Sequence, residues 1–309
     1  MSQRERVAII GAGLMGHGIA QLFAVAGHPV AITDVSNEAL ASARDRVRSN
    51  LRRAGADPAP ADAIESCQSL ERAVADAQLV VEAAPEDLDL KRRLFGRLGE
   101  AAPAEAILAS NTSVMSIGEI GRDAVDPGRV VGTHFWNPPY LIPLVEVVQA
   151  AATRIEIVQR VMSILASAGK APVHVRRDIP GFVGNRLQHA LWREAISLVE
   201  HGVCDAEAVD AVVRQSFGLR LPVLGPLENA DLVGLDLTLA IHEYVLPHLE
   251  RSPGPSPLLR ELVASGELGA KTGRGFGRWD ADRIEATQQR LFAQLSGALS
   301  RQPNDLEGA

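Results

Sequence analysis

The chain has 309 residues, of which 46% are hydrophobic and 22% charged, and its net charge is −7 at pH 7. This composition is ordinary for a water-soluble globular protein, and the length predicts two domains, one of them large enough for a complete α/β core. The acidic balance argues against a general nucleic-acid-binding protein, and no apolar run is long enough to cross a bilayer.

The two cysteines, Cys67 and Cys204, lie far apart and match no metal-binding or redox spacing. The first residues lead directly into a predicted strand, with no apolar leader segment before it. Both features predict a reduced, cytoplasmic compartment.

A glycine-rich turn near the N-terminus predicts a dinucleotide site. Residues 6–10 predict an apolar strand, residues 17–26 a helix, and residues 29–33 a second strand followed by Asp34. Between the first strand and the helix the sequence is Gly11-Ala12-Gly13-Leu14-Met15-Gly16. In such a turn the first glycine permits the tight bend, the second lets the backbone approach a pyrophosphate, and the third lets helix and strand pack closely. The spacing to Asp34 favours a nucleotide site over a coincidental glycine turn.

Asp34 also bears on which nucleotide binds. A carboxylate there accepts hydrogen bonds from ribose hydroxyls and repels a 2′-phosphate, and residues 35–37 offer no arginine to hold one. NAD is therefore favoured over NADP, while FAD stays compatible with this motif alone.

The following segment predicts the rest of an α/β sheet. Residues 79–82 and 106–110 predict strands, and residues 37–53 and 87–98 predict helices, the second of which contains Lys91. This alternation indicates a doubly wound, mostly parallel sheet. Ligands bind beyond the carboxyl ends of such strands, where Glu86, Asn111 and Ser113 fall. For Ser113, an ordinary cap of a helical turn at residues 115–120 fits equally well.

The stretch from Gly132 to Val148 places one histidine and one carboxylate in a run that is otherwise mostly apolar. Residues 131–135 and 145–148 predict two buried strands with a proline-rich turn between them, because proline cannot continue a strand ladder. Two strands joined by a bend can bring His134 and Glu146 together. A histidine oriented by a buried carboxylate is a general-base arrangement, although a core pair that serves only packing is equally compatible.

After this stretch the pattern becomes helical. Residues 154–168 predict a helix and residues 172–175 the last strand of the sheet. The predicted domains are residues 1–180, the nucleotide-binding domain, and residues 181–309, an all-α domain. Asn185 lies in the first turn of the first helix of the second domain. Its carboxamide either donates to a substrate oxygen or is simply a polar residue of a first turn.

The other histidines have no acidic or histidine partner at metal-ligand spacing and predict packing or surface positions, with no metal site. They are His17, His28, His174, His189, His201, His242 and His248. The glycine-rich loop at residues 271–276 opens no clear helix. A turn that orders a helix at residues 280–299 is therefore preferred there over an anion cradle.

Eight short motifs, taken together and in order, carry a family resemblance. They are Gly11-Ala-Gly-Leu-Met-Gly16, Val81-Glu-Ala-Ala-Pro-Glu86, Ser110-Asn-Thr-Ser113, His134-Phe-Trp-Asn-Pro138, Leu144-Val-Glu-Val147, Pro180-Gly-Phe-Val-Gly-Asn-Arg186, Gly225-Pro226 and Lys271-Thr-Gly-Arg-Gly-Phe276. With these motifs the chain resembles the 3-hydroxyacyl-CoA dehydrogenase family over nearly its whole length.

The resemblance implies a Rossmann-type N-terminal domain and a helical C-terminal domain that binds substrate and usually forms a homodimer. It implies NAD as cofactor and oxidation of a secondary alcohol on a 3-hydroxyacyl compound. By position, His134 is then the base and Glu146 its partner, and Ser113 and Asn185 hold the reacting oxygen. Glu86, Lys91 and Asn111 are placed along the cofactor.

One departure from the family concerns the substrate. Acyl-CoA-using members carry a long helical hairpin with lysine and serine contacts to CoA. Here the stretch from Asp34 to Glu82 is shorter, and residues 35–90 contain no lysine. Several arginines between residues 44 and 53 could replace those phosphate contacts. Trp136 and the run Pro138-Pro139-Tyr140 also depart from the usual family sequence. In these respects the chain looks more like relatives that act on small carboxylates without CoA, such as carnitine, gulonate and pyridine-carboxylate dehydrogenases.

Three functions stay open on the sequence. The family default is NAD-dependent oxidation of a 3-hydroxyacyl-CoA thioester, and the alternative is the same chemistry on a small hydroxy acid, or on a carboxylate bearing a hydroxymethyl or aldehyde group, without CoA. The third is a non-catalytic protein on this fold, as some lens crystallins are. The joint presence of Ser113, His134, Glu146 and Asn185 argues against that third function.

Overall fold

The computed structural model describes residues 4–299, and the chain divides into two compact units. Unit 1 contains the chain up to Arg186 together with the end of helix α12 (Ala281–Leu299) from Phe292 onward, and unit 2 contains Leu187–Leu291. The sequence-based division at residues 180 and 181 lies in the segment between the last strand and helix α7 (Gly184–Glu200).

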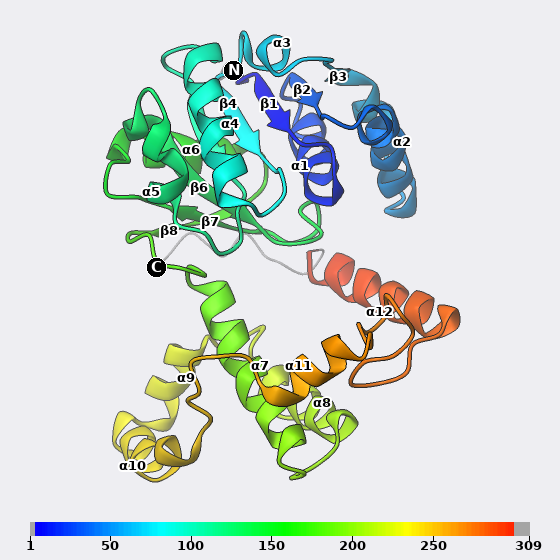
Figure 1. The fold of residues 1–309 in the computed structure, drawn as a ribbon, viewed down its shortest axis with the longest axis vertical. Helices are drawn as coiled ribbons and strands as arrows, with labels where there is room; N and C mark the ends of the chain where they lie inside the picture. The colour runs from blue at the N-terminus through cyan, green and yellow to red at the C-terminus, as the bar shows by residue number, and fades with distance from the viewer. Residues whose placement is uncertain (1–3, 300–309) are drawn as a thin grey trace. The chain divides into compact units, whose positions relative to one another are not determined.

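Unit 1 is built on one eight-stranded sheet with the order β3-β2-β1-β4-β5-β6-β7-β8 (Figure 1). Neighbouring strands are parallel throughout, except that β6 and β7 are antiparallel. The prediction of a doubly wound, mostly parallel sheet is thereby confirmed. The strands are β1 (Val7–Ile10), β2 (Val30–Thr33), β3 (Ile64–Ser66), β4 (Leu79–Glu82), β5 (Ile107–Ser110), β6 (Val130–Phe135), β7 (Leu144–Val148) and β8 (Ala171–Val175).

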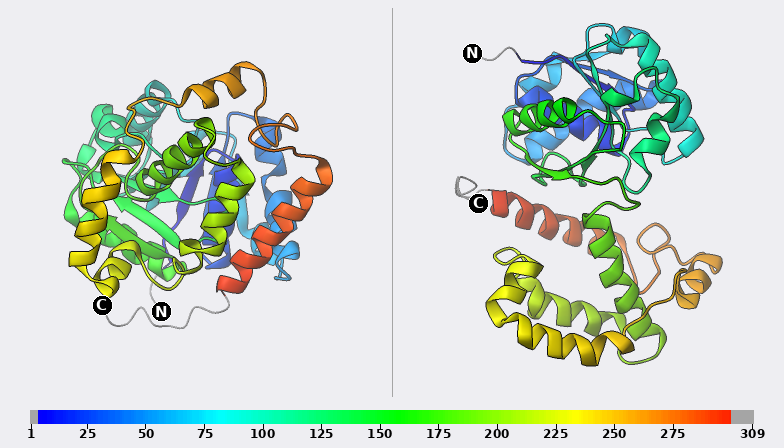
Figure 2. Two further views of the ribbon diagram at one scale, coloured as in Figure 1. Left: turned by 90° about the horizontal axis from the view of Figure 1, so that it is seen from below. Right: turned by 90° about the vertical axis from the view of Figure 1, so that its left-hand side faces the viewer.

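Helices cover both faces of this sheet, and each face has its own apolar core (Figures 1 and 2). In β1, Val7 and Ile9 pack into the core formed with α1 (Leu14–Val25), α2 (Asn37–Arg53) and α6 (Ile155–Ser167). The alternating residues Ala8 and Ile10 pack into the opposite core, with α3 (Leu70–Val74), α4 (Leu88–Ala101) and α5 (Ile117–Ile120). Because strand side chains alternate between faces, a central strand buried on both sides must be apolar at every position, as β1 is.

Side-chain caps set where the helices of unit 1 begin. The hydroxyl of Ser36 accepts from the backbone N–H of Ala39 at the start of α2, and Asp87 accepts from Leu90 N at the start of α4. At α5 the cap is Ser116, which accepts from Glu119 N. The alternative interpretation of Ser113 as a helix cap is therefore wrong.

Unit 2 is helical. Its elements are the greater part of α7, then α8 (Ala206–Gln215), α9 (Pro226–Val233), α10 (Leu235–Val245), α11 (Pro257–Ala264) and the start of α12. Short 3-10 turns occur at Ala59–Ala63, Gly121–Asp123 and Pro127–Arg129 in unit 1 and at Phe217–Leu219 and Leu246–His248 in unit 2. Within Leu187–Leu291 the strand-like pairing consists of two isolated bridges in the loop before α12. Across residues 4–299, no helix has both the length and the apolar character needed to cross a membrane.

Candidate active site

His134 and Glu146 lie directly opposite each other on the antiparallel strands β6 and β7. The imidazole Nδ1 is 2.7 Å from the Glu146 Oε2, and both residues are buried. The predicted meeting of these two side chains follows from the strand register, because opposed residues of an antiparallel pair share one face of the sheet. With the carboxylate at Nδ1, that nitrogen carries the hydrogen and Nε2 is left with the free lone pair.

The second oxygen of Glu146 is held by the start of α7. Its Oε1 accepts from the backbone N–H groups of Val183 and Gly184 at 2.9 and 3.0 Å. The turn that presents them contains Phe182 at φ 50°, a left-handed conformation that is uncommon for a non-glycine residue. Helix N-termini favour anions, so the carboxylate lies where its charge is stabilised.

These contacts decide the ionisation of Glu146. Burial by itself would raise the pKa of the carboxyl, but the hydrogen bonds from His134 and from the N–H groups of Gly184 and Val183 outweigh it. The result is a pKa below the ordinary glutamate value. Glu146 is therefore an anion at neutral pH, able to orient His134 and to stabilise it when it gains a proton.

Two aromatic rings flank the imidazole of His134. Its ring centroid lies 5.1 Å from Trp136 and 5.7 Å from Phe182. Trp136 packs directly on Gly184, where an added Cβ would collide with the indole. These two rings pack against the imidazole, and His134 and Glu146 are both buried, so the His–Glu pair is shielded from water.

The side chain of Lys170 anchors the loop between β6 and β7. This loop contains a cis peptide bond between Asn137 and Pro138. The buried Lys170 Nζ donates to the carbonyl oxygens of Pro139 and Ile142 at 2.5 and 2.9 Å, and burial lowers the pKa of the amine to about 8. The segment beyond Trp136 thus has a fixed backbone position.

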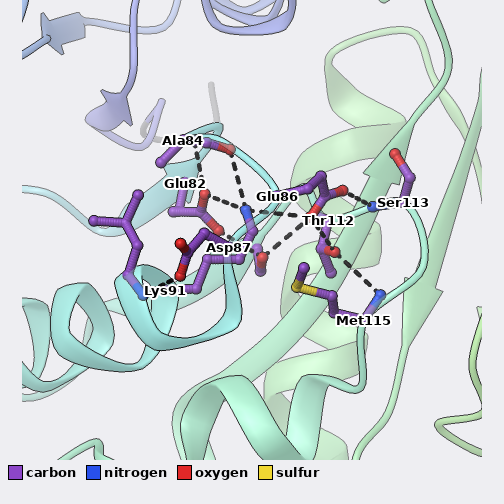
Figure 3. A network of polar contacts seen from close by, with 10 residues as sticks. Glu82, Ala84, Glu86, Asp87, Lys91, Thr112, Ser113 and Met115 are labelled. Carbon is purple, nitrogen blue, oxygen red and sulfur yellow. Dashed lines mark hydrogen bonds and ion pairs between the residues drawn. The ribbon is translucent and has the colours of Figure 1, made fainter. Parts of the chain in front are cut away.

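Ser113 is held by its backbone rather than by its hydroxyl. Its N–H donates to Glu86 Oε1 at 2.6 Å, and its carbonyl oxygen accepts from the Asn185 Nδ2 at 2.8 Å. Thr112 adds a hydroxyl hydrogen bond to Glu86 Oε2 at 2.7 Å (Figure 3). The structure therefore brings Glu86, Ser113 and Asn185 together. The bonds that fix Ser113 involve its backbone and not its hydroxyl.

A buried ion pair lies beside Glu86 (Figure 3). Lys91 Nζ is 2.6 Å from Glu82 Oε1, and Glu82 also accepts from the Ser110 hydroxyl and the backbone N–H of Ala84. Lys91 and Glu82 have almost no exposed surface. The Lys91 ammonium therefore contacts Glu82, the Ala84 carbonyl oxygen and, at 3.7 Å, Glu86. Its predicted place along the cofactor stays a prediction.

The glycine turn between β1 and α1 has the shape of a dinucleotide cradle. Gly11 has φ 104°, and a Cβ there would come within 2.6 Å of the Ala83 carbonyl oxygen. A Cβ at Gly16 would overlap the carbonyl oxygen of Gly11, whereas the space beside Gly13 is open. No side chain caps α1, so the first N–H groups of this helix stay available for a phosphate. Leu14, the first residue of α1, is exposed, and Met15 follows it.

Asp34 lies at the same turn. Its two carboxylate oxygens accept from the backbone N–H groups of Ala12 and Ser36 at 2.6 and 2.7 Å. These bonds hold an anionic group at the end of β2, next to the glycine turn, where it suits ribose hydroxyls and disfavours a 2′-phosphate. The residues present fit NAD, which accepts a hydride when bound.

The side chain of Asn111 forms a hydrogen bond within the protein. Its Oδ1 accepts from the backbone N–H of Phe135 at 3.0 Å, which ties the end of β5 to the residue that follows His134. Sequence reasoning overlooked two features of the site, Glu82 and the pair of N–H groups at Val183 and Gly184. A charged residue ending the apolar strand Leu79–Glu82 was the available signal for Glu82. Backbone donors leave no signal in a sequence.

A buried histidine–glutamate pair at the end of the sheet where the glycine turn forms a dinucleotide cradle is the arrangement expected of a nicotinamide-dependent dehydrogenase. Comparison with known sequences agrees with this class. The family described as "3-hydroxyacyl-CoA dehydrogenase, NAD binding domain" matches residues 6–179, and "3-hydroxyacyl-CoA dehydrogenase, C-terminal domain" matches residues 181–279. The chain belongs to the 3-hydroxyacyl-CoA dehydrogenase family.

Similar proteins in this family differ in substrate. The chain is 39% identical to the 3-hydroxyadipyl-CoA dehydrogenase of Escherichia coli over 90% of its length, but it spans only 60% of that relative. It is 42% identical to the L-carnitine dehydrogenase of Streptomyces griseus, over 74% of this chain and 70% of the relative. A solved structure of a 5-formyl-3-hydroxy-2-methylpyridine 4-carboxylic acid 5-dehydrogenase, an NAD⁺-dependent dismutase, superposes with a TM-score of 0.88 at 30% identity, covering 96% of this chain and 97% of that one.

The chain is thus an NAD-dependent dehydrogenase of hydroxyl groups in a family whose members act both with and without CoA. Among residues 4–299 no cluster of three or more His, Cys, Asp or Glu side chains has the arrangement of a metal site.

Proposed function

We propose that the protein oxidises the secondary alcohol of a small 3-hydroxy acid, with NAD as hydride acceptor and without a CoA group on the substrate. The observation that carries the chemistry is the buried His134–Glu146 pair, with Nδ1 bound to the carboxylate and Nε2 left to act. Nε2 takes the hydroxyl proton while the carbon loses a hydride, and Glu146 stabilises the imidazolium that forms. Positioned general bases of this kind contribute about 10²–10⁴-fold to rate.

Ser113 and Asn185 hold the reacting oxygen in this proposal. The Ser113 hydroxyl is free to donate, because Glu86 and Asn185 fix the residue through its backbone. The Asn185 amide uses one hydrogen on Ser113 and has a second for the substrate. Donors already fixed in place stabilise the changing charge on the oxygen without reorganisation.

The short connection after α2 supports a substrate without CoA. Between the end of α2 at Arg53 and the start of β3 at Ile64, the structure has only the turn Ala59–Ala63, at the place where the family resemblance implies a helical hairpin in CoA-using members. The arginines of α2 are partly occupied. Arg48 binds Asp45 and Asp62, and Arg46 binds the carbonyl oxygens of Ala12 and Ala39.

A second candidate is the acyl-CoA thioester, which the similarity to the E. coli 3-hydroxyadipyl-CoA dehydrogenase favours. Arg52 and Arg53 at the end of α2 are exposed and are the groups that could meet a CoA phosphate.

A truncation experiment separates the two candidates. We compare 3-hydroxybutyryl-CoA with its N-acetylcysteamine thioester and with free hydroxy acids, 3-hydroxybutyrate and carnitine, following NADH absorbance. Without a CoA site, kcat/KM is equal for the two thioesters and higher for a free acid. A gain of tenfold or more from the full CoA group, lost in Arg52→Ala/Arg53→Ala, would establish the thioester instead.

The role of His134 is tested on whichever substrate turns over. We expect His134→Gln to lower kcat by about 10²–10⁴-fold, the contribution of a general base, with the Kd for NADH unchanged. Ser113→Ala is the matched second variant, expected to lower kcat less because Asn185 still donates. Full turnover in His134→Gln would remove this residue from the mechanism.

We also propose that the protein is a cytoplasmic homodimer that pairs through unit 2. Apolar side chains are exposed along its helices, notably Leu227, Leu232, Leu235 and Leu239. Exposed apolar groups at this density are typical of a surface that a partner covers.

A further inference from the structure

The charges around Glu86 do not cancel. Glu82 and Lys91 form a buried pair at 2.6 Å and compensate each other. Glu86 is 3.7 Å from the same ammonium, and its closer partners are neutral donors, the Thr112 hydroxyl and the Ser113 N–H. Two carboxylates thus share one lysine, and one negative charge is left on the partly exposed Glu86 at the carboxyl ends of β4 and β5.

Neither the N-terminus of helix α4 nor the guanidinium of Arg92 neutralises the charge of Glu86. The first turn of α4 is capped by Asp87, which accepts from the backbone N–H of Leu90 at 2.8 Å. On α4, the guanidinium of Arg92 is engaged by Glu119 and Asp89. The excess charge therefore belongs to Glu86.

This charge lies at the reacting end of the site. Glu86 is bonded to the backbone of Ser113, the residue that holds the substrate oxygen in the proposed function. The nicotinamide ring has to reach the carbon that bears this oxygen, so it must come to the same edge of the sheet. The ring is positively charged in NAD⁺ and neutral in NADH. A fixed carboxylate at this edge attracts the positively charged ring of NAD⁺, whereas the neutral ring of NADH offers it no net charge.

We propose that Glu86 makes the site selective for the oxidised form of the cofactor, through the uncompensated charge of the Glu82–Lys91–Glu86 group. This inference rests on the proposed position of the reacting oxygen beside Ser113. Selective binding of NAD⁺ leaves the overall reaction equilibrium unchanged, but at equal concentrations of the two forms it places more of the enzyme in the NAD⁺-bound state. It therefore equips the enzyme to run in the direction of alcohol oxidation.

The test is the ratio of two dissociation constants, measured without any substrate. NADH binding is followed by its fluorescence, and NAD⁺ binding by calorimetry, for the wild type and for Glu86→Gln. Glutamine keeps the length and one acceptor oxygen but leaves the group neutral. We expect Kd(NAD⁺)/Kd(NADH) to rise about tenfold, as for loss of a unit charge near a partly screened site.

Two variants control for shape and for general charge. Glu86→Asp retains the charge and is expected to keep the wild-type ratio even if both forms bind more weakly. Asp89→Asn removes an exposed carboxylate from the first turn of the same helix and is expected to leave the ratio unchanged.

The inference is overturned if Glu86→Gln weakens NAD⁺ and NADH by the same factor, since Glu86 would then act only as a support for Ser113. An equal shift of the ratio in Asp89→Asn would also overturn it, because the selectivity would come from the overall acidity of the protein. Failure of the proposed substrate chemistry would appear as absent turnover and leaves this titration readable.

Discussion

At the scale of single residues, the site depends on Glu146 having both oxygens occupied. His134 binds one oxygen, and the N–H groups of Val183 and Gly184 bind the other. The carboxylate can therefore neither rotate away from the imidazole nor take a proton easily, which fixes the tautomer of His134. The same bonds make the stability of the fold depend on pH, because they favour the charged form of Glu146.

Glu146→Gln is expected to lower kcat by at least tenfold and to remove a pH-dependent part of stability. Because the folded-state pKa of Glu146 lies below the ordinary value of 4.5, its ionised form stabilises the fold. That contribution is fully present above pH 4.5 and is lost as the pH falls toward the lower folded-state pKa. Urea unfolding of both proteins between pH 7 and pH 3 measures it.

The stability gap between wild type and Glu146→Gln should narrow as the pH falls through that window. A constant gap would mean that Glu146 is not preferentially ionised in the folded protein. An unchanged pH–rate profile in the variant would argue separately against the catalytic pairing with His134.

At the scale of elements, the sequence pattern located the long or strongly apolar pieces well. It predicted β4 and α2 with their observed bounds, and β6 and β7 to within one residue. It missed β3, with three residues, and α3, with five, because such short elements show no full period of either pattern. The His134–Glu146 meeting was predictable because adjacent strands align them, whereas the Glu82–Lys91 pair needs the packing of α4 onto β4.

Lys91→Met is expected to destabilise unit 1 by about 3–5 kcal/mol, since it leaves the buried carboxylate of Glu82 without its cationic partner. The matched control is the double variant Glu82→Gln/Lys91→Met, which removes both charges and should recover part of the loss. Denaturant unfolding followed by circular dichroism measures both. Equal stability of Lys91→Met and the wild type would show that Glu82 is not held as an anion.

At the scale of the whole molecule, the two units differ in how they bury apolar surface. In unit 1 both faces of the sheet are covered, and the two clusters hold most of the large apolar residues. In unit 2 the large apolar residues are mostly exposed, and α8, α9, α10 and α11 contain no buried residue. Helices with so little buried surface need further burial to be stable, and a second copy of unit 2 would supply it.

The homodimer is therefore expected to be tight and to depend on unit 2. Light scattering coupled to gel filtration should give about twice the chain mass of 32.9 kDa. Leu232→Asp, which places a charge on an exposed apolar position of α9, should shift the protein toward monomer and lower its melting temperature. The control is Val125→Asp, at an equally exposed apolar position of unit 1, which should remain dimeric. A wild-type mass of one chain, or dissociation by the unit 1 variant alone, would contradict pairing through unit 2.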